Sequence, residues 1–515
     1  MSTERARHDD PSANRRARAL ATAALVACAY AFRLPPLLNA RSTNSDAAVV
    51  GLQAMHLLRG EHAAFLWGSG YQTAADAYVA AGFFALFGAT PLVLMLSSLT
   101  LHVVATLLVF ATLCRRFSAW MALLLSAPMI VASSSIHSYA LYPPRQLSIT
   151  LAVAAFFAIH GASRSTGGHA RLWLGAGGLA YGLAITADPY PMVLAPIVLG
   201  YGLLVAADLP IERVLPLATG FLAGLVPFLV LRRLPGASSG PMGLSPSVIG
   251  HNWELLVREC LPWALDYKVY FARNGMSYEP WDAPLWARVI MVVGALCLPV
   301  LVGIALLSIF RTSVPRSTRM LGFCAALGFP STIAAFLVSV MVMDRFSMRY
   351  LAVLTVLLPF AAAPAASLLR ARTFALLFVP HLAASAIGGW VGYGPFVHGV
   401  VPVRETPHLR DDYTLLDALR AHGVTYAEAD YWTAYRLTFL FHEEVVVVPT
   451  NAGEDRHAPY RRAFESAATF AYVYDPGRSR ESLEEAERNL ITHYSSDRVT
   501  RAHAGRLTLL VVRRR

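Results

Sequence analysis

The sequence predicts a polytopic α-helical membrane protein with a small α/β domain after its last membrane span. Hydrophobic residues make up 56% of the 515 residues and charged residues only 15%, whereas an ordinary soluble domain has about 25% charged residues. The deficit lies in repeated apolar runs of roughly 16 to 24 residues, which are long enough to cross the hydrocarbon core of a bilayer. Residues 395–515 instead have ordinary polarity and alternate between strand and helix patterns.

The net charge of +11 indicates membrane topology rather than nucleic-acid binding, because much of the excess arginine lies in short loops and tails beside apolar runs. The five cysteines are scattered and form no Cys-x-x-Cys pair, so neither a disulfide framework nor a thiolate metal site is indicated. The first apolar run lacks a small-residue cleavage site, so we expect it to be retained as a membrane span.

We expect about eleven spans, and the arginines between them orient the chain. The basic tail 1–18 places the N-terminus in the cytoplasm, and each expected inner loop contains arginine. The odd number places the first outer loop (39–91), the long outer loop (232–286) and the C-terminal domain (395–515) on the same, extracytoplasmic side. The membrane module covers 19–394, and its expected spans are 19–38, 92–113, 118–134, 147–160, 172–187, 191–206, 214–231, 287–310, 320–342, 350–368 and 374–392.

The stretch 44–88 of the first outer loop is too polar to cross a bilayer and too long to be a simple turn. Its first half has apolar residues at helical spacing, and Ser45 or Asp46 is placed to cap that helix. Residues 75–87 predict a second helix, lying at the membrane interface. The same stretch holds the carboxylates Asp46 and Asp76 and, between them, Trp67 and Tyr71.

Each of these four residues has an ordinary structural explanation beside a functional one. Asp46 could be a helix cap, a general base acting on an acceptor hydroxyl, or a metal ligand. Asp76 could be a surface charge on an amphipathic helix or a second carboxylate at the same site. Trp67 and Tyr71 could be interfacial anchors or the wall of a sugar or lipid site.

Further candidates lie at the outer ends of other expected spans. Arg145 could extend toward lipid headgroups, or its planar guanidinium could bind a lipid-linked phosphate. Arg345 and Arg349, at the outer end of span 350–368, admit the same two explanations. The remaining candidates for substrate contact are His137, Tyr142, Asp188 and Tyr190.

The C-terminal domain has local signals for both helices and strands. Helices are expected at 415–422 and 481–490, and strands at 426–430, 445–449, 468–474 and 507–512. We find no glycine-rich phosphate loop in this domain. Four of its residues could close over the site, recognise an acceptor or form the domain's own core: Tyr431, Trp432, Tyr435 and Arg436.

Four features together identify a resemblance. They are Asp46 early in the first outer loop, the continuation LLRGEHAAFLWGSGYQTAADAYVAAGFFALFG, the pair Arg349-Tyr350 at the start of a late span, and a soluble domain after the last span. With these features the chain resembles the GT-C fold glycosyltransferases, which include protein O-mannosyltransferases and lipid A aminoarabinose transferases. The resemblance covers most of 19–394, and the loop is its most specific part.

The resemblance implies a cell-membrane enzyme that transfers a sugar from a polyprenyl-phosphate donor to an acceptor hydroxyl on the outer face. It implies that Asp46 is the catalytic carboxylate and that Asp76 assists it or the acceptor. In the mechanism that we expect to follow, Arg145, Arg345 or Arg349 binds the donor phosphate. Displacement from one face would invert the anomeric centre. Besides the donor, the implied partners are membrane lipids and a glycan, lipid or protein acceptor.

A divalent metal, Mg or Mn, is used by some relatives and not by others, and Asp46 would be its ligand here. Protein mannosyltransferases tend to have two adjacent acids at this point, where this chain has Asp46-Ala47. That departure weakens the case for a protein acceptor and the case for a metal held by such a pair of acids.

Two other classes of function fit a polytopic chain. A lipid or solute transporter predicts charges inside the spans and an internal repeat, but the expected spans are almost free of charges and no repeat is visible. A protein that binds lipid-linked sugars without transferring them predicts that Asp46 and Asp76 do not converge on one cavity.

Overall fold

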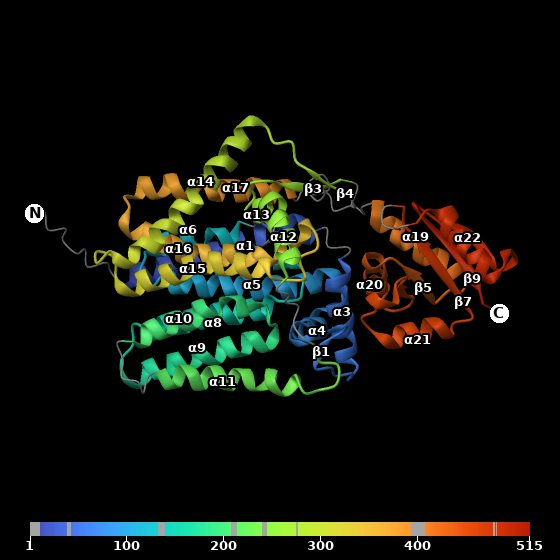
Figure 1. Ribbon diagram of the computed structural model, residues 1–515, viewed down its shortest axis with the longest axis horizontal. Coiled ribbons are helices and arrows are strands. Elements are labelled where there is room, and N and C mark those ends of the chain that lie inside the picture. Colours follow the sequence, from blue (N-terminus) through green and yellow to red (C-terminus); the bar gives the residue numbers. More distant parts are fainter. Residues whose placement is uncertain are drawn as a thin grey trace, which may run out of the picture.

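The computed structural model describes residues 11–38, 43–131, 140–207, 214–238, 245–273, 277–392, 407–476, 479 and 481–514. It is mainly a bundle of long helices that run side by side, and an α/β unit formed by residues 407–514 lies at one end of the bundle (Figure 1). Helices α3 (Ser45–Leu58) and α4 (Ala75–Phe87) lie at that same end, next to the α/β unit. The first outer loop and the C-terminal unit are therefore neighbours in space.

Every expected span overlaps at least one helix in the described part of the chain, although span 320–342 extends beyond the end of its helix at Leu337 and span 19–38 is broken between Ala31 and Leu34. The bundle consists of α1 (Pro11–Ala31), α2 (Leu34–Leu38), α5 (Pro91–Leu113), α6 (Ala119–Ile130), α8 (Gln146–Ala162), α9 (Gly167–Ala187), the 3-10 turn Tyr190–Leu194 with α10 (Ala195–Ala206), α11 (Val214–Leu231), α14 (Leu285–Leu307), α15 (Arg316–Leu337), the 3-10 turn Arg345–Leu351 with α16 (Ala352–Leu368), and α17 (Ala371–Gly392).

Length and composition would allow six helical segments of the described residues to cross a membrane. These are Pro91–Leu113, Val214–Leu231, Leu285–Phe310, Arg316–Leu337, Arg345–Leu368 and Ala371–Val391. Shorter apolar helices are Ala75–Phe87, Ala119–Ile130, Gln146–Ala162 and Tyr190–Ala206. A polytopic helical architecture thus agrees with the expectation, and the number of eleven spans stays a prediction.

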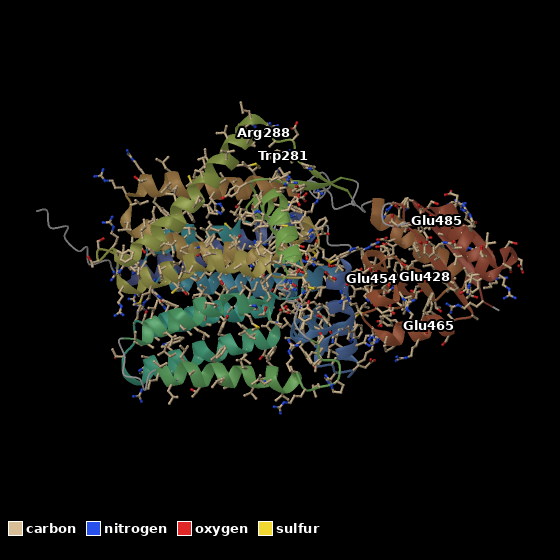
Figure 2. All side chains as sticks on the ribbon, in the orientation of Figure 1. Trp281, Arg288, Glu428, Glu454, Glu465 and Glu485 are labelled. Carbon is tan, nitrogen blue, oxygen red and sulfur yellow. The ribbon has the colours of Figure 1, made fainter. Side chains whose placement is uncertain are left out.

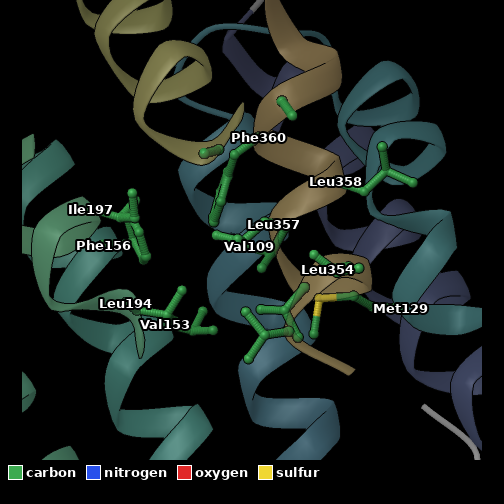
Figure 3. Packing of buried hydrophobic residues seen from close by; sticks show 14 of the residues in the cluster. Val109, Met129, Val153, Phe156, Leu194, Ile197, Leu354, Leu357, Leu358 and Phe360 are labelled. Atoms are coloured by element: carbon green, nitrogen blue, oxygen red, sulfur yellow. The ribbon is translucent and has the colours of Figure 1, made fainter. Parts of the chain in front are cut away.

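Helix α16 forms the centre of the bundle. Leu354, Leu357 and Phe360 of this helix are almost completely buried, and they pack toward α5, α6 and α8 (Figure 3). The Phe360 ring lies 5.6 Å from the Phe156 ring of α8. Because the helix is enclosed on all sides by apolar side chains, the turn Arg345–Leu351 at its start is held on a rigid base.

Helices α9 and α11 approach each other unusually closely. A Cβ atom on Gly178 would lie 2.1 Å from the carbonyl oxygen of Leu217, and one on Gly220 would lie 2.2 Å from that of Gly175. Only glycine permits this separation, and small residues at helix interfaces are typical of membrane bundles. The glycines of this pair are therefore explained by packing.

The first outer loop contains the two predicted helices, α3 and α4, joined by a hairpin of β1 (Phe65–Leu66) and β2 (Ser69–Thr73) that the sequence did not predict. The cap of α3 differs from the expectation. Asn44 is the N-cap, and its side-chain oxygen accepts a hydrogen bond from the Ala47 amide at 2.8 Å. The prediction that Ser45 or Asp46 caps the helix is therefore wrong, because the helix begins one residue earlier.

The long outer segment contains α12 (Pro246–Leu255), a π-helical turn (Leu256–Cys260), α13 (Leu261–Ala264) and the hairpin β3 (Tyr270–Arg273)–β4 (Ser277–Pro280). Trp281 and Arg288 follow this hairpin, at the side of the bundle (Figure 2).

A five-stranded sheet with strand order β6-β5-β7-β9-β8 forms the core of the C-terminal unit. Strands β6, β5 and β7 are parallel, whereas β9 is antiparallel to both β7 and β8. The elements are α19 (Pro407–Ala421), β5 (Tyr426–Ala429), α20 (Tyr431–Leu440), β6 (Val446–Pro449), α21 (Ala458–Ser466), β7 (Thr469–Tyr474), α22 (Leu483–Tyr494), β8 (Val499–Ala504) and β9 (Leu507–Arg513).

All six local predictions in this unit correspond to an element, but α20, α21 and β8 were not predicted. Strand β8 is an edge strand with exposed Thr500, Arg501 and His503, so it lacks an apolar pattern. Helix α20 buries one face on its own sheet and the other on α3. Its sequence therefore lacks the one-sided apolar stripe by which a surface helix is recognised.

The contact between α20 and α3 is a shared apolar core. Phe439 of α20 is 1% exposed and lies against Gly51 of α3. Ala47 and Val50 of α3 belong to the same buried cluster as Tyr435 and Phe439. The C-terminal unit is therefore packed onto the first outer loop by the same kind of contact that forms a domain core.

We predict that Gly51→Ala destabilises the protein although alanine favours helix. A Cβ at position 51 would lie 2.7 Å from Cε2 of the buried Phe439, and such overpacking costs about 1–3 kcal/mol. Gly82→Ala in α4 is the matched control, since its Cβ meets nothing within 4 Å and should stabilise by about 0.5–1 kcal/mol. Thermal unfolding of the purified full chain measures both, and equal upward shifts of the midpoint would contradict the packing argument.

Candidate active site

A cavity of about 180 Å³ lies where the first outer loop, the start of α8, the start of α16 and the C-terminal unit meet. Its described lining residues include one carboxylate, that of Asp46, and three guanidinium groups, those of Arg145, Arg349 and Arg456. The other described lining residues are Asn44, Val49, Leu66, Trp67, Ser69, Tyr71, Gln72, Tyr142, Pro143, Pro144, Tyr190, Met341, Tyr350 and Tyr431.

Asp46 faces this cavity from the first turn of α3. Its Oδ1 accepts a 2.6 Å hydrogen bond from the Tyr431 hydroxyl, and its Oδ2 lies 3.5 Å from Nη1 of Arg349. Its side chain is 26% exposed. Because Asn44 already caps the helix, the Asp46 carboxylate is available to the cavity.

Arg145 lies opposite, directly before α8, with its guanidinium held by three side chains. Its Nε donates to Oδ2 of Asp188 at 3.0 Å, and its Cζ lies 5.3 Å from the Tyr190 ring centre and 5.0 Å from that of Tyr350. Asp188 is 2% exposed and also accepts hydrogen bonds from the Gln72 amide and the Tyr190 backbone. Asp188 thus lies behind Arg145 and fixes its charge at the cavity wall.

The backbone of Arg145 has φ = 100°, in the left-handed region. For a residue with a side chain this conformation costs on the order of 1–3 kcal/mol and persists only where its surroundings hold it. Asp76 is what holds it, since its carboxylate accepts from the Arg145 amide at 3.0 Å and from the Leu147 amide at 3.3 Å.

Asp76 is therefore behind the cavity wall, and it is absent from the described lining residues. It is 8% exposed. Burial raises the pKa of Asp76 to about 6, although the two amide donors lower it. This position favours a role in shaping the Arg145 turn over direct contact with substrate, and the expected catalytic role of Asp76 remains a prediction.

The three candidate phosphate-binding arginines separate into two groups. Arg145 and Arg349 line the cavity. Arg345 forms an ion pair with Glu259 at 3.1 Å and lies over the Tyr270 ring, outside the set of described lining residues.

Of the expected substrate-contact residues, Trp67, Tyr71, Tyr142 and Tyr190 line the cavity, whereas Asp188 lies behind Arg145. Trp67 also stacks on His457 of the C-terminal unit with the ring centres 3.8 Å apart. His137 lies outside the residues that the structure describes.

Two lining residues, Tyr431 and Arg456, come from the C-terminal unit. Arg456 donates from Nε to the Tyr431 hydroxyl at 3.2 Å and from Nη1 to the Gly68 carbonyl at 3.0 Å. Burial and then the Asp46 charge raise the pKa of Tyr431, so its hydroxyl keeps the proton that it donates to Asp46. Sequence reasoning offered Tyr431 as one of several alternatives and missed Arg456, which has no local signal.

The surroundings of Asp46 do not fit a divalent metal site. Its two described polar neighbours are a phenol and a guanidinium, both of which donate hydrogen bonds, whereas Mg²⁺ and Mn²⁺ prefer oxygen acceptors. Among the described residues no group of three or more His, Cys, Asp or Glu side chains could hold a metal ion.

A polar cluster beside the cavity joins α3 to the C-terminal unit. His56 of α3 contacts Oε2 of Glu61 with Nδ1 at 2.8 Å and Oε1 of Glu443 with Nε2 at 2.6 Å. Glu443 also accepts hydrogen bonds from Arg59 and Tyr460. Both ring nitrogens of His56 face carboxylates, an arrangement that suits the doubly protonated imidazolium.

No family model matches this sequence, and no curated protein matches it. Two solved structures are similar to it in fold. They are ArnT from Cupriavidus metallidurans in the apo state, with 14% sequence identity, a TM-score of 0.49 and coverage of 95% of this chain and 97% of that chain, and ArnT from the same organism bound to undecaprenyl phosphate, with 12% identity, a TM-score of 0.46 and the same coverage. At this level of identity the likeness concerns the overall fold alone.

We predict that docking of the C-terminal unit is strongest at mildly acidic pH. Burial lowers the pKa of His56, but the hydrogen bonds to Glu443 and Glu61 outweigh burial and raise it above 6.5. Its contribution is complete below pH 6.5 and is lost as pH rises through the raised value. Burial raises the pKa of Glu443, but its hydrogen-bond donors outweigh burial and lower it to about 2, so its contribution is complete above pH 4.5 and is lost toward pH 2.

The thermal unfolding midpoint of the full chain, measured between pH 5 and pH 9, tests this window. The wild-type midpoint should fall above pH 6.5 more steeply than that of His56→Gln, which keeps a side-chain amide but does not titrate. Parallel profiles for the two proteins would rule out the histidine as the source of the pH dependence.

Proposed function

We propose that this protein is a membrane glycosyltransferase that moves a sugar from a polyprenyl-phosphate donor to an acceptor hydroxyl on the extracytoplasmic face, with inversion. The observation that supports it most directly is the cavity lining, in which the carboxylate of Asp46 lies among the guanidinium groups of Arg145, Arg349 and Arg456. A base is needed to remove the acceptor proton, and cations are needed to bind the phosphate that leaves.

Asp46 acts as the general base in this proposal. The acceptor hydroxyl attacks the anomeric carbon, its proton passes to the Asp46 carboxylate, and the bond between the anomeric carbon and the phosphate oxygen breaks. Tyr431 donates to the other carboxylate oxygen and holds the group in place. Attack from the side opposite the leaving phosphate inverts the anomeric centre.

Arg145 and Arg349 bind the donor phosphate and stabilise the charge that develops as it leaves. Arg145 is suited to this role because Asp188, Tyr190 and Tyr350 fix its guanidinium before a donor arrives, and a preorganised cation costs little reorganisation during the reaction. Arg349 also lies 3.5 Å from Asp46, so the proposed phosphate-binding group is next to the proposed base. Trp67, Tyr71, Tyr142 and Tyr190 form the walls for the sugar ring or the first prenyl units.

The proposed enzyme lies in the cell membrane with its N-terminus in the cytoplasm. The module 19–394 holds the prenyl chain between its helices, and the unit 395–515 is extracytoplasmic and completes the site. The position of the first outer loop and the C-terminal unit at one end of the bundle supports this arrangement. The acceptor is a glycan, a lipid or a protein.

We predict that a deletion strain accumulates one polyprenyl-phosphate sugar and that Asp46→Asn fails to restore its use. Asparagine still accepts from Tyr431 but cannot take a proton, so transfer should fall by about 10²–10⁴-fold. The measurement is lipidomics of the strain carrying each variant. Asp430→Asn is the matched control, because Asp430 caps α20 and asparagine caps as well as aspartate.

The control variant should clear the accumulated lipid as the wild type does. Equal clearance of the lipid by Asp46→Asn would contradict the assignment of Asp46 as the base. The absence of any accumulated polyprenyl-phosphate sugar in the deletion strain would contradict the proposed function itself.

We predict that Arg349→Ala raises the KM for the donor by about 10–100-fold, since a hydrogen bond to a charged group contributes about 1.5–3 kcal/mol. Arg345→Ala is the control, because Arg345 pairs with Glu259 instead. Arg145→Ala is less informative, because it would leave the buried Asp188 without its cation and so destabilise the fold. Steady-state kinetics with the donor lipid identified above would measure the KM of each variant. A wild-type KM in both variants would contradict phosphate binding at Arg349.

A further inference from the structure

A second cavity, of about 310 Å³, lies at the other end of the bundle. Its described lining residues are Arg18, Arg115, Gly161, Arg164, Ser165 and Trp173. Helix α8 joins the two cavities, since Arg145 precedes it and Arg164 follows it shortly after its last residue. Its 17 residues correspond to about 25 Å at 1.5 Å per residue, so the second cavity is well separated from Asp46.

Three guanidinium groups from three different segments converge on this cavity. Arg18 comes from α1, Arg115 from the turn after α5, and Arg164 from the turn after α8. Nη1 of Arg115 donates to the Phe157 carbonyl at 3.2 Å, and its Cζ lies 4.2 Å from the Phe157 ring centre. These two contacts hold the guanidinium against α8 at the edge of the cavity.

Contacts with the end of α5 explain part of this cluster. Arg18 donates to the Cys114 carbonyl at 3.4 Å, and Arg164 donates to the Arg115 carbonyl. Cations near the last carbonyls of a helix are favourable. Each guanidinium has five N–H donors, however, and these contacts use only part of that capacity.

The charge of the cluster is not balanced within the described part of the chain. None of the described carboxylates forms an ion pair with Arg18, Arg115 or Arg164. Burial and then the nearby charge of Arg164 lower the pKa of Arg115, as expected for a partly buried guanidinium beside a second cation. The first cavity differs, because Asp46 and Asp188 pair with its arginines. An anion in the second cavity would therefore relieve repulsion that the described residues leave in place.

We propose that this cavity binds a phosphate group, supplied by an anionic phospholipid headgroup or by free phosphate. Planar guanidinium forks match phosphate oxygens. The cavity far exceeds the ~10–15 Å³ needed for one water, and Trp173 supplies an amphipathic wall of the kind found at membrane interfaces. The position at the ends of apolar helices favours the lipid source.

The test uses the purified full chain in detergent and measures its thermal unfolding midpoint. The probes are phosphatidylglycerol and, separately, inorganic phosphate, each at an ionic strength matched with chloride. A ligand that binds only the folded protein raises the midpoint with concentration and so yields an apparent Kd. We expect phosphatidylglycerol to raise the midpoint of the wild type. Stabilisation by phosphate alone would assign the site to free phosphate.

The double variant Arg18→Gln/Arg164→Gln should raise the apparent Kd by about tenfold or more. The matched control Arg16→Gln/Arg116→Gln removes the same charge from α1 and from the turn after α5, at exposed positions that are absent from the described lining, and should change Kd by less than about twofold. No stabilisation of the wild type by either probe, or equal weakening in both double variants, would overturn the proposal.

If the site variant does not fold, Arg164→Lys replaces it. Lysine keeps the charge at this exposed position and loses the fork, so Kd should rise by a few-fold, and an unchanged Kd would equally overturn the proposal. None of these residues lines the Asp46 cavity in the described chain, so this result is independent of the proposed transferase activity.

Discussion

The packing of the C-terminal unit on α3 is the constraint on which the candidate active site depends. Tyr431 and Asp46, which meet in a 2.6 Å hydrogen bond, are 385 residues apart in the chain. Phe439 seated on Gly51 and Glu443 bonded to His56 hold the same two segments together. Without this contact Asp46 would lie at an open helix end, and the cavity would lose the side of its wall that Tyr431 and Arg456 form.

The charges of the site are arranged in layers. Arg145 stands at the cavity wall, Asp188 fixes its guanidinium from behind, and Asp76 fixes its backbone. The Arg145 guanidinium is therefore held in place by the surrounding protein and still faces the cavity. In the proposed reaction, such preorganisation would stabilise the phosphate leaving group, because the surrounding dipoles need not reorient. In this arrangement Asp76 supports the backbone turn at Arg145, and its expected catalytic role stays a prediction.

The helix bundle connects two cavities of different character. The start of α8 contributes Arg145 to the cavity that also contains Asp46, and the turn after its end contributes Arg164 to a cavity with three arginines. The closely packed α16 lies at the centre of the bundle that separates them. If both proposals hold, the lipid-phosphate site would anchor the protein at a defined depth and so keep the proposed active site at the level of the proposed donor phosphate.

The sequence by itself determined the apolar helices, the helices of the first outer loop and most strands of the C-terminal unit, because these follow from local periodicity. It also singled out Asp46, as a carboxylate of the first outer loop, and Arg145 and Arg349, as guanidinium groups at the outer ends of expected spans. Only the tertiary structure decided that Asn44 caps α3, that Asp76 supports Arg145 and that Arg456 reaches the cavity. These facts depend on contacts between segments distant in the chain, and a local pattern holds no information about which segments meet.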